Sequence, residues 1–176
     1  MTGLPEVVAD PGGNTRSDGG LVVEGLTVVT EGRGTPVVED VTFRVARGHV
    51  LGLVGESGSG KSTVGVALLG LARNGLRIAA GRVCIDGIDI LSLEGKSLQR
   101  ARGRLVAYVP QDPASGLNPA LRVGRQLREA IAIHSDVLRD DETIEGRVLQ
   151  LMEEVGLPST ETFLNSYPHQ MSGGQQ

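Results

Sequence analysis

Residues 55–63 read GESGSGKST, and this stretch decides how the rest of the chain is interpreted. It fits the pattern G-x-x-x-x-G-K-[ST], in which a glycine-rich loop joins a strand to a helix. The neighbouring sequences agree, because HVLGLV before it is typical of a short buried strand and VGVALLGLA after it of a helix. The simpler alternative is a Gly/Ser turn with a surface lysine. The four fixed positions occur by chance in roughly fewer than 1% of chains of this length, so we interpret the stretch as a phosphate-binding loop.

The residue types of this loop match the chemistry of a triphosphate. Glycines at 55, 58 and 60 allow backbone N–H groups to turn toward one point, and the following helix directs its positive end there. Lys61 adds a charge for the β and γ phosphates, and the Ser62 hydroxyl is a candidate ligand for Mg²⁺. The candidate nucleotide-binding residues are Gly55, Glu56, Ser57, Gly58, Ser59, Gly60, Lys61, Ser62 and Thr63.

Composition narrows the class of protein further. Hydrophobic residues make up 39% of the 176 residues, which suits one domain with a sizeable core. The net charge of -4 and the lack of a basic stripe give no indication of nucleic acid as a partner. The single cysteine, Cys84, excludes an internal disulfide and is expected to lie buried in a strand. No stretch reaches about 18 apolar residues, so we expect any membrane role to come through a partner.

The early part of the chain is predicted to be rich in strands. Residues 1–20 combine Gly, Pro and charges with few apolar groups, which predicts a disordered tail. The runs LVVEGLTVV (21–29) and VTFRV (41–45) predict strands, and HVLGLV (49–54) predicts the strand that leads into the loop. A helix is predicted over residues 61–72.

The later part is predicted to become helical. In GRVCIDGIDIL (81–91) the pair Asp86-Gly87 separates two apolar runs, which is the signal of a two-residue hairpin. RLVAYV (104–109) predicts one more strand. Apolar residues at helical spacing then predict two amphipathic helices, at residues 123–134 and 144–155.

Two features after the loop carry further chemistry. Gln111 follows the predicted strand 104–109, where its amide could reach a metal ion or an attacking water, although a solvated loop amide is the simpler interpretation. In MSGGQQ (171–176), Ser172 could cap a helix whose exposed N–H groups make a second anion site. Read alone, Ser-Gly-Gly indicates a plain turn. We therefore interpret the two features together with the loop.

The loop, Gln111 and the SGGQ sequence, in this order, resemble the nucleotide-binding subunit of an ABC transporter over residues 21–176. Within that family, GESGSGKST, QDPASGLNPALRVGRQL and YPHQMSGG resemble the branch that powers uptake of oligopeptides, dipeptides or nickel. The resemblance implies an α/β phosphate-loop fold with an antiparallel β subdomain and a helical subdomain at about 112–170. His169 is expected to be a surface or packing histidine, since no second metal ligand is evident.

The resemblance also implies cofactors and roles for the matching residues. ATP and Mg²⁺ would be bound by residues 55–63, with Ser62 and Gln111 at the metal ion. Gln111 is the candidate catalytic residue, because it would sense the metal ion and the attacking water. The signature residues, which would act in trans on ATP held by a second subunit, are Ser172, Gly173, Gly174 and Gln175.

The partners implied by the family are a second nucleotide-binding subunit, as a homo- or heterodimer, integral membrane permease subunits and an extracellular solute-binding protein. The chain would then lie at the cytoplasmic face of the cell membrane as a peripheral subunit. Two alternatives remain open. One is a soluble ABC-type ATPase without a transporter, and the other is a non-catalytic nucleotide-binding fragment.

The chain departs from the family in two ways. Members stack adenine on an aromatic residue at the end of the first strand, whereas this chain has Thr30 there, leaving a weaker apolar contact such as Val29 as the alternative. The chain also ends before the family's Walker B aspartate, catalytic glutamate and switch histidine. The resemblance therefore implies an N-terminal fragment with an incomplete core sheet, inactive on its own and exposing an edge at strand 49–54.

Overall fold

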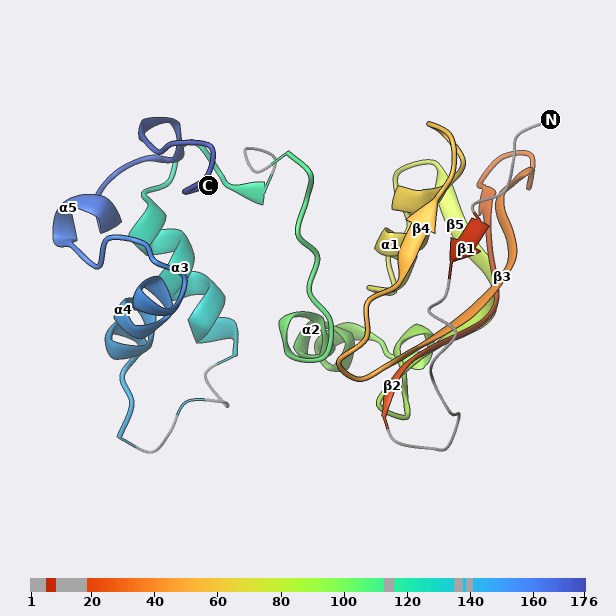
Figure 1. The fold of residues 1–176 in the computed structure, drawn as a ribbon, viewed down its shortest axis with the longest axis horizontal. Helices are drawn as coiled ribbons and strands as arrows, with labels where there is room; N and C mark the ends of the chain where they lie inside the picture. Colours follow the sequence, from red (N-terminus) through yellow and green to blue (C-terminus); the bar gives the residue numbers. More distant parts are fainter. Residues whose placement is uncertain (1–5, 9–18, 113–115, 135–137, 139–140) are drawn as a thin grey trace. The chain divides into compact units, whose positions relative to one another are not determined.

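The computed structural model describes residues 6–8, 19–112, 116–134, 138 and 141–176. The chain divides into two compact units that meet in the sequence between Tyr108 and Val109, and each is described by itself. The first unit contains the described strands together with helices α1 and α2, and the second is helical (Figure 1). The fold is therefore of the α/β class, as the sequence predicts.

A four-stranded antiparallel sheet, in the order β3-β2-β5-β6, forms most of the first unit. Its long, curved strands are visible in Figure 1. On β2, Val23 lies opposite Phe43 of β3 and Val83 of β5, and all three side chains are buried. The strands predicted at 21–29 and 41–45 are thereby confirmed. The four strands are β2 (Gly20–Thr30), β3 (Pro36–Ala46), β5 (Leu76–Ile85) and β6 (Ile88–Asp89).

The turn between β5 and β6 is the predicted Asp86-Gly87 hairpin. Both residues have positive φ, 49° and 82°, as a type I′ turn requires. The Asp86 carboxylate accepts the Gly20 N–H at 2.6 Å and pairs with Arg47 Nη2 at 2.8 Å, so it ties the turn to β2 and to the end of β3. The hydrogen bonds from Arg47 and Gly20 hold the pKa of Asp86 below its ordinary value.

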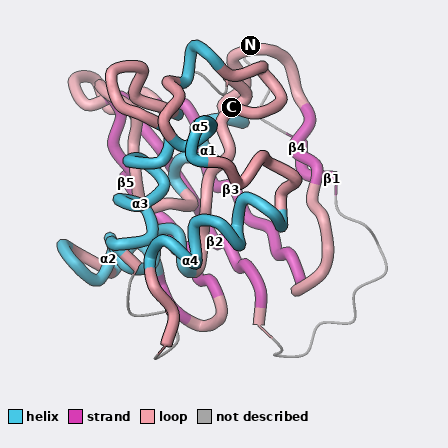
Figure 2. The backbone as a smooth tube through the Cα atoms, turned by 90° about the vertical axis from the view of Figure 1, so that its left-hand side faces the viewer, coloured by secondary structure: helices cyan, strands magenta, loops and turns pink. Residues whose placement is uncertain are grey.

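Strand β4 (Gly52–Val54) leads into the phosphate loop and pairs with β1 (Glu6–Val8) in antiparallel register (Figure 2). Val7 lies opposite Leu53. Residues 6–8 thus differ from the disordered tail predicted for residues 1–20; the other tail residues up to 18 lie outside the described part. Backbone groups on a strand edge need partners, and β1 supplies them along one edge of β4.

Helix α1 (Lys61–Ala67) begins directly after the loop. It is shorter than the predicted helix, because residues 68–70 form a turn. Gly60 precedes it with a φ of 92°, and a Cβ on Gly60 would lie 2.8 Å from Val38 Cγ2 and 3.1 Å from Val37 O of strand β3. Glycine alone lets the loop lie this close to the sheet.

The segment after β6 contains two elements that the sequence reading did not predict, η1 (Ile90–Ser92) and α2 (Gly95–Arg104). Helix α2 is kinked, since Gly103 has a φ of 83°. The Arg102 guanidinium donates to Leu69 O at 2.9 Å and to Gly70 O at 3.2 Å, and these bonds fix α2 to the turn after α1. The signal for α2 is weak because its sequence is largely polar.

The prediction of a strand at residues 104–109 is wrong. Among the described residues this segment shows a single parallel bridge, Arg102↔Val106, in place of a ladder. The apolar sequence favours a strand, but a strand forms only where a partner pairs with its backbone. Val109 is accordingly 87% exposed.

The second unit, Val109–Gln176, includes the range 112–170 predicted as a helical subdomain. Helices α3 and α4 pack against each other and confirm the two amphipathic helices of the prediction (Figure 1). A small core forms around Val148, Met152 and Leu164. Across α3 and α4, Arg128 donates to both carboxylate oxygens of Glu145, at 2.6 and 2.7 Å. The elements are α3 (Val123–Ile133), α4 (Ile144–Glu154), α5 (Glu161–Leu164) and η4 (Pro168–Gln170).

Gly60→Ala is expected to destabilise the first unit more than Gly58→Ala. Both glycines have φ near 90°, where alanine costs about 1–2 kcal/mol. Only at Gly60 would the new Cβ meet Val38, which adds about 1–3 kcal/mol of overpacking. Urea unfolding followed by circular dichroism measures both losses. Equal losses would show that the close approach to β3 has no energetic consequence.

Asp86→Asn is expected to lower stability at pH 7 and to have little effect in acid. Because folding lowers the pKa of Asp86, its charged form stabilises the fold above the ordinary pKa of about 3.9, and this stabilisation is lost as the pH falls through the lower folded value. Asparagine tolerates positive φ, so the turn is kept. Urea midpoints measured from pH 7 to about pH 3 test this, and a constant difference would contradict the charge pairing with Arg47.

Candidate functional site

The phosphate loop connects β4 to α1 in the structural context that its sequence pattern requires. Gly55, Gly58 and Gly60 all have positive φ, which explains why glycine stands at each of these three positions. Inside the loop the Ser59 N–H donates to Glu56 O at 3.2 Å. The loop is therefore a compact turn with its shape fixed by its own backbone.

The ammonium group of Lys61 is held inside this turn. Lys61 Nζ donates to Gly55 O at 2.7 Å, to Glu56 O at 2.6 Å and to Ser59 Oγ at 3.2 Å. Ser59 is buried, with 7% of its surface exposed. The lysine thus directs its positive charge at the centre of the loop, where the sequence predicts the phosphates.

The donor groups around this charge fit a phosphate chain. In the part of the chain that the structure describes, the N–H groups of Gly58, Lys61 and Ser62 have no hydrogen-bond acceptor, and the space beside Gly58 is open. The Ser62 side chain is exposed and its hydroxyl has no described partner. Free N–H donors suit anionic oxygens, and a hydroxyl oxygen is a ligand that Mg²⁺ accepts. Residues 55–63 therefore have the groups that a Mg²⁺ triphosphate needs.

Thr30, at the position where the family resemblance implies an aromatic residue, is used by the turn between β2 and β3. Its hydroxyl accepts the Thr35 N–H at 3.0 Å, its N–H donates to Thr35 O at 2.9 Å, and its carbonyl accepts the Gly34 N–H at 3.0 Å. Thr30 thus organises the turn and offers no flat surface to a base.

Gln111 is exposed and lies in the second unit, just before residues 113–115, which are outside the described part. It follows an irregular segment, since the predicted strand is absent. Further along the chain, Gln126 of α3 holds residues 118–121. Its amide accepts the Asn118 N–H at 2.8 Å and donates to Asn118 O and Leu121 O at 3.1 and 3.0 Å. Gln126 was not foreseen from the sequence, because these bonds join residues eight positions apart and no local pattern marks them.

The SGGQ sequence forms a turn with the hydrogen bonds of half a capping box. Gln175 Oε1 accepts the Ser172 N–H at 3.0 Å, and the Gln175 N–H donates to Ser172 O at 2.9 Å. The Ser172 hydroxyl and the N–H groups of Gly173 and Gly174 have no acceptor or donor among the described residues. The predicted signature residues therefore lie together, with their polar groups available to a ligand.

An aromatic cluster next to this turn was not foreseen from the sequence. The rings of Tyr167 and His169 stack with centroids 5.7 Å apart and planes 14° apart, and the Arg122 guanidinium lies 6.0 Å from the Tyr167 ring. Pro168, which lies between these two residues in the sequence, is buried. The prediction of a surface or packing role fits His169, which is exposed. The signal that was available is the spacing Tyr-Pro-His, in which two rings are separated by a rigid residue.

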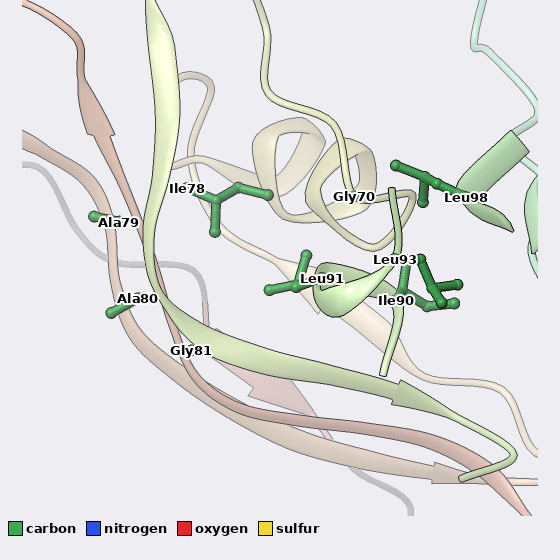
Figure 3. Close-up of a pocket in the computed structure, with 9 residues that line it drawn as sticks. All are labelled: Gly70, Ile78, Ala79, Ala80, Gly81, Ile90, Leu91, Leu93 and Leu98. Carbon is green, nitrogen blue, oxygen red and sulfur yellow. The ribbon is translucent and has the colours of Figure 1, made fainter. Parts of the chain in front are cut away.

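A pocket of about 270 Å³ in the first unit is chemically unlike the loop. Figure 3 shows side chains of β5, η1 and α2 around it. No lining residue carries a polar side chain, so the pocket has no side-chain group for a phosphate or a metal ion. The lining residues are Gly70, Ile78, Ala79, Ala80, Gly81, Ile90, Leu91, Leu93 and Leu98.

Comparison with known proteins agrees with the motifs. The profile of the ABC transporter family matches residues 38–176. The chain is 37% identical to the oligopeptide transport ATP-binding protein OppD of Lactococcus lactis subsp. cremoris, over 82% of this chain and 42% of that protein. It is 40% identical to the dipeptide transport ATP-binding protein DppD of Haemophilus influenzae, over 88% of this chain and 47% of that protein. The chain thus spans less than half the length of these relatives.

A solved structure shares the fold. The dimeric structure of a post-hydrolysis state of the ATP-binding cassette MJ0796, bound to ADP and Pi, matches with a TM-score of 0.64 and 25% sequence identity. The match covers 88% of this chain and 64% of that one. The chain therefore shares the fold of an ATP-binding cassette.

Within the described residues, no helix is both long and apolar enough to cross a membrane. The family profile and the peptide-transport relatives point to the same family as the phosphate loop and the signature turn. The chain belongs to the ABC transporter family.

Proposed function

We propose that this chain binds Mg²⁺-ATP as part of the ATP-binding subunit of an ABC importer for peptides or nickel. The observation that carries the proposal is the position of Lys61 Nζ within 2.7 Å of two loop carbonyl oxygens, in a loop that also has N–H groups without described acceptors. A phosphate chain entering the loop would exchange those carbonyls for anionic oxygens, which bind an ammonium group more strongly.

Each candidate residue would have a distinct role in binding the phosphates, the metal ion or the attacking water. Backbone N–H groups of residues 55–63 and the Lys61 ammonium would hold and neutralise the phosphates, and Ser62 and Gln111 are the proposed ligands of the metal ion. Mg²⁺ supplies charge neutralisation when bound. Gln111 also orients the attacking water and reports the state of the site to the membrane subunit. Phosphoryl transfer needs positioning and electrostatic stabilisation more than covalent chemistry, and these groups supply both.

The signature residues Ser172, Gly173, Gly174 and Gln175 are proposed to act on ATP held by a second subunit. Two observations support this role. The Gln175 side chain already satisfies the Ser172 N–H, which leaves the Ser172 hydroxyl and the glycine N–H groups for an external anion. The similar cassette MJ0796 was solved as a dimer with ADP and Pi. Homo- and heterodimers are both compatible with this arrangement.

The remaining partners follow from the relatives, which are named as oligopeptide and dipeptide transport ATP-binding proteins. We propose that the subunit attaches to integral membrane permease subunits at the cytoplasmic face of the membrane, in a system with an extracellular solute-binding protein. We also propose that hydrolysis needs a Walker B aspartate, a glutamate and a switch histidine supplied outside residues 1–176. The 176-residue chain by itself would then bind ATP without turnover.

Lys61→Ala is expected to weaken ATP binding by at least about tenfold, because it removes a charged hydrogen-bond donor to the phosphates. Isothermal titration calorimetry with Mg²⁺-ATP measures the affinity. Lys96→Ala is the matched control, since it removes the second of the chain's two lysines from α2. An unchanged affinity in Lys61→Ala, with the fold intact by circular dichroism, would refute the assignment of the loop.

Ser62→Ala is expected to separate the metal ion from the phosphates. Loss of the hydroxyl should weaken binding of ATP in the presence of Mg²⁺ by several-fold and leave binding in EDTA nearly unchanged. Thr63→Ala, which removes the adjacent hydroxyl of the same loop, is the comparison, and any weakening that it causes should be the same with and without Mg²⁺. Equal weakening of Ser62→Ala with and without Mg²⁺ would count against Ser62 as a metal ligand.

A further inference from the structure

Thr30 stands where the family resemblance implies an aromatic residue for the base, and the chain has few aromatic residues to take its place. It contains two Tyr, two Phe and no Trp. Phe43 is buried in the first core, and Phe163 packs against the second. Thr30 is engaged in the β2–β3 turn. Among the tyrosine, phenylalanine and tryptophan side chains, only Tyr108 and Tyr167 are left as candidates to stack on a purine.

Tyr108 lies against helix α1, because a Cβ placed on Gly65 would be 4.0 Å from the Tyr108 ring. Its ring therefore packs beside the helix that follows the phosphate loop, and no second ring supports it in the described structure. Tyr167 differs on both counts. It is stacked on His169, and the Arg122 guanidinium lies near its ring. Flat π-systems backed by a cation are surfaces on which nucleobases stack.

The cluster of Arg122, Tyr167 and His169 is held in a defined geometry. Arg122 Nη1 donates to Asn165 Oδ1 at 2.8 Å, which fixes the guanidinium. Tyr167 and Gln170 exchange two hydrogen bonds, with the Tyr167 N–H donating to Gln170 Oε1 at 2.8 Å and the Gln170 N–H to Tyr167 O at 2.9 Å. The exposed His169 ring extends the stack toward solvent.

The cluster and the signature turn form one continuous hydrogen-bonded segment. Ser172 is five residues after Tyr167, and the Gln176 side chain donates back to Pro168 O at 2.6 Å. The γ phosphate and the base lie at opposite ends of a nucleotide, so two separate groups must contact them. This segment provides the signature turn for the phosphate and the ring cluster for the base. If the signature acts on the nucleotide of a second subunit, the ring cluster is carried to the same nucleotide.

We propose that the Tyr167–His169 stack of one subunit packs against the purine base of the nucleotide held by the phosphate loop of a second copy of this chain. This inference rests on the proposed function. It places the base contact that Thr30 does not provide in the partner copy. The strength of stacking depends on the area of the base ring and not on its hydrogen-bond pattern. ATP and GTP should therefore bind similarly, and both more tightly than UTP.

The first test compares ATP with inorganic tripolyphosphate, which lacks a base, at protein concentrations where ATP drives dimerisation. Tyr167→Ala is expected to weaken ATP binding roughly five- to a hundredfold and to leave tripolyphosphate binding unchanged. Tyr167→Phe should retain ATP binding, and His169→Ala should lose part of it. Tyr108→Ala is the matched aromatic control and should behave as the unmodified chain.

The second test separates a contact in trans from one within a single chain. Neither Lys61→Ala nor Tyr167→Ala forms a complete site with itself. Mixing the two variants creates dimers in which the loop of the Tyr167→Ala chain faces the intact rings of the Lys61→Ala chain. One tight ATP site should then reappear, measured by calorimetry and by ATP-dependent association in sedimentation velocity.

Several results would overturn the proposal. These are unchanged ATP binding in Tyr167→Ala, a loss of ATP selectivity in Tyr108→Ala instead, no recovery on mixing, and no ATP-driven dimer. The failure of the proposed function has a different signature, because Lys61→Ala would then retain both ATP and tripolyphosphate. If Tyr167→Ala fails to fold, the exposed His169→Ala variant decides by the same comparison, and an unchanged ATP affinity in that variant overturns the proposal.

Discussion

The close approach of Gly60 to strand β3 is the constraint on which the first unit depends. A side chain at this position would enter the space of Val38 and the Val37 carbonyl. The loop can therefore pack against the sheet only if residue 60 is glycine. That contact sets where α1 begins, and α1 in turn buries Val64 and Ala67 in the first core. The antiparallel sheet, which contains no residue of the loop itself, thereby determines the place of the phosphate site.

Local sequence patterns predicted the features that depend on neighbours in the chain. The β2 and β3 strands follow from alternating apolar residues, the β5–β6 hairpin from Asp86-Gly87, and α3 and α4 from their apolar stripes. Features that depend on distant partners were missed. RLVAYV has the composition of a strand but has no described ladder to join, whereas Glu6–Val8 acquires strand structure because β4 offers an edge.

The candidate site shows the same division. The phosphate loop was predictable, because Gly55, Gly58 and Gly60 have positive φ and Lys61 completes a fixed motif. The signature turn was predictable from the SGGQ sequence and its order after the loop. Three features depend on three-dimensional contacts. They are the role of Thr30 in the β2–β3 turn, the hydrogen bonds between Gln126 and Asn118, and the stack of Tyr167 on His169. Residue identity alone does not reveal such contacts. The loop belongs to the first unit, whereas Gln111 and the signature turn belong to the second.

The ammonium of Lys61 has a consequence for how an anion enters the loop. Its three bonds to Gly55 O, Glu56 O and Ser59 Oγ make the lysine an internal ligand of its own loop. A phosphate therefore binds by competition, displacing neutral oxygens that already solvate the charge, and the net affinity reflects the difference between the two sets of acceptors. Changes to the Ser59 hydroxyl would then alter nucleotide affinity through the lysine, by changing the strength of the competing acceptor.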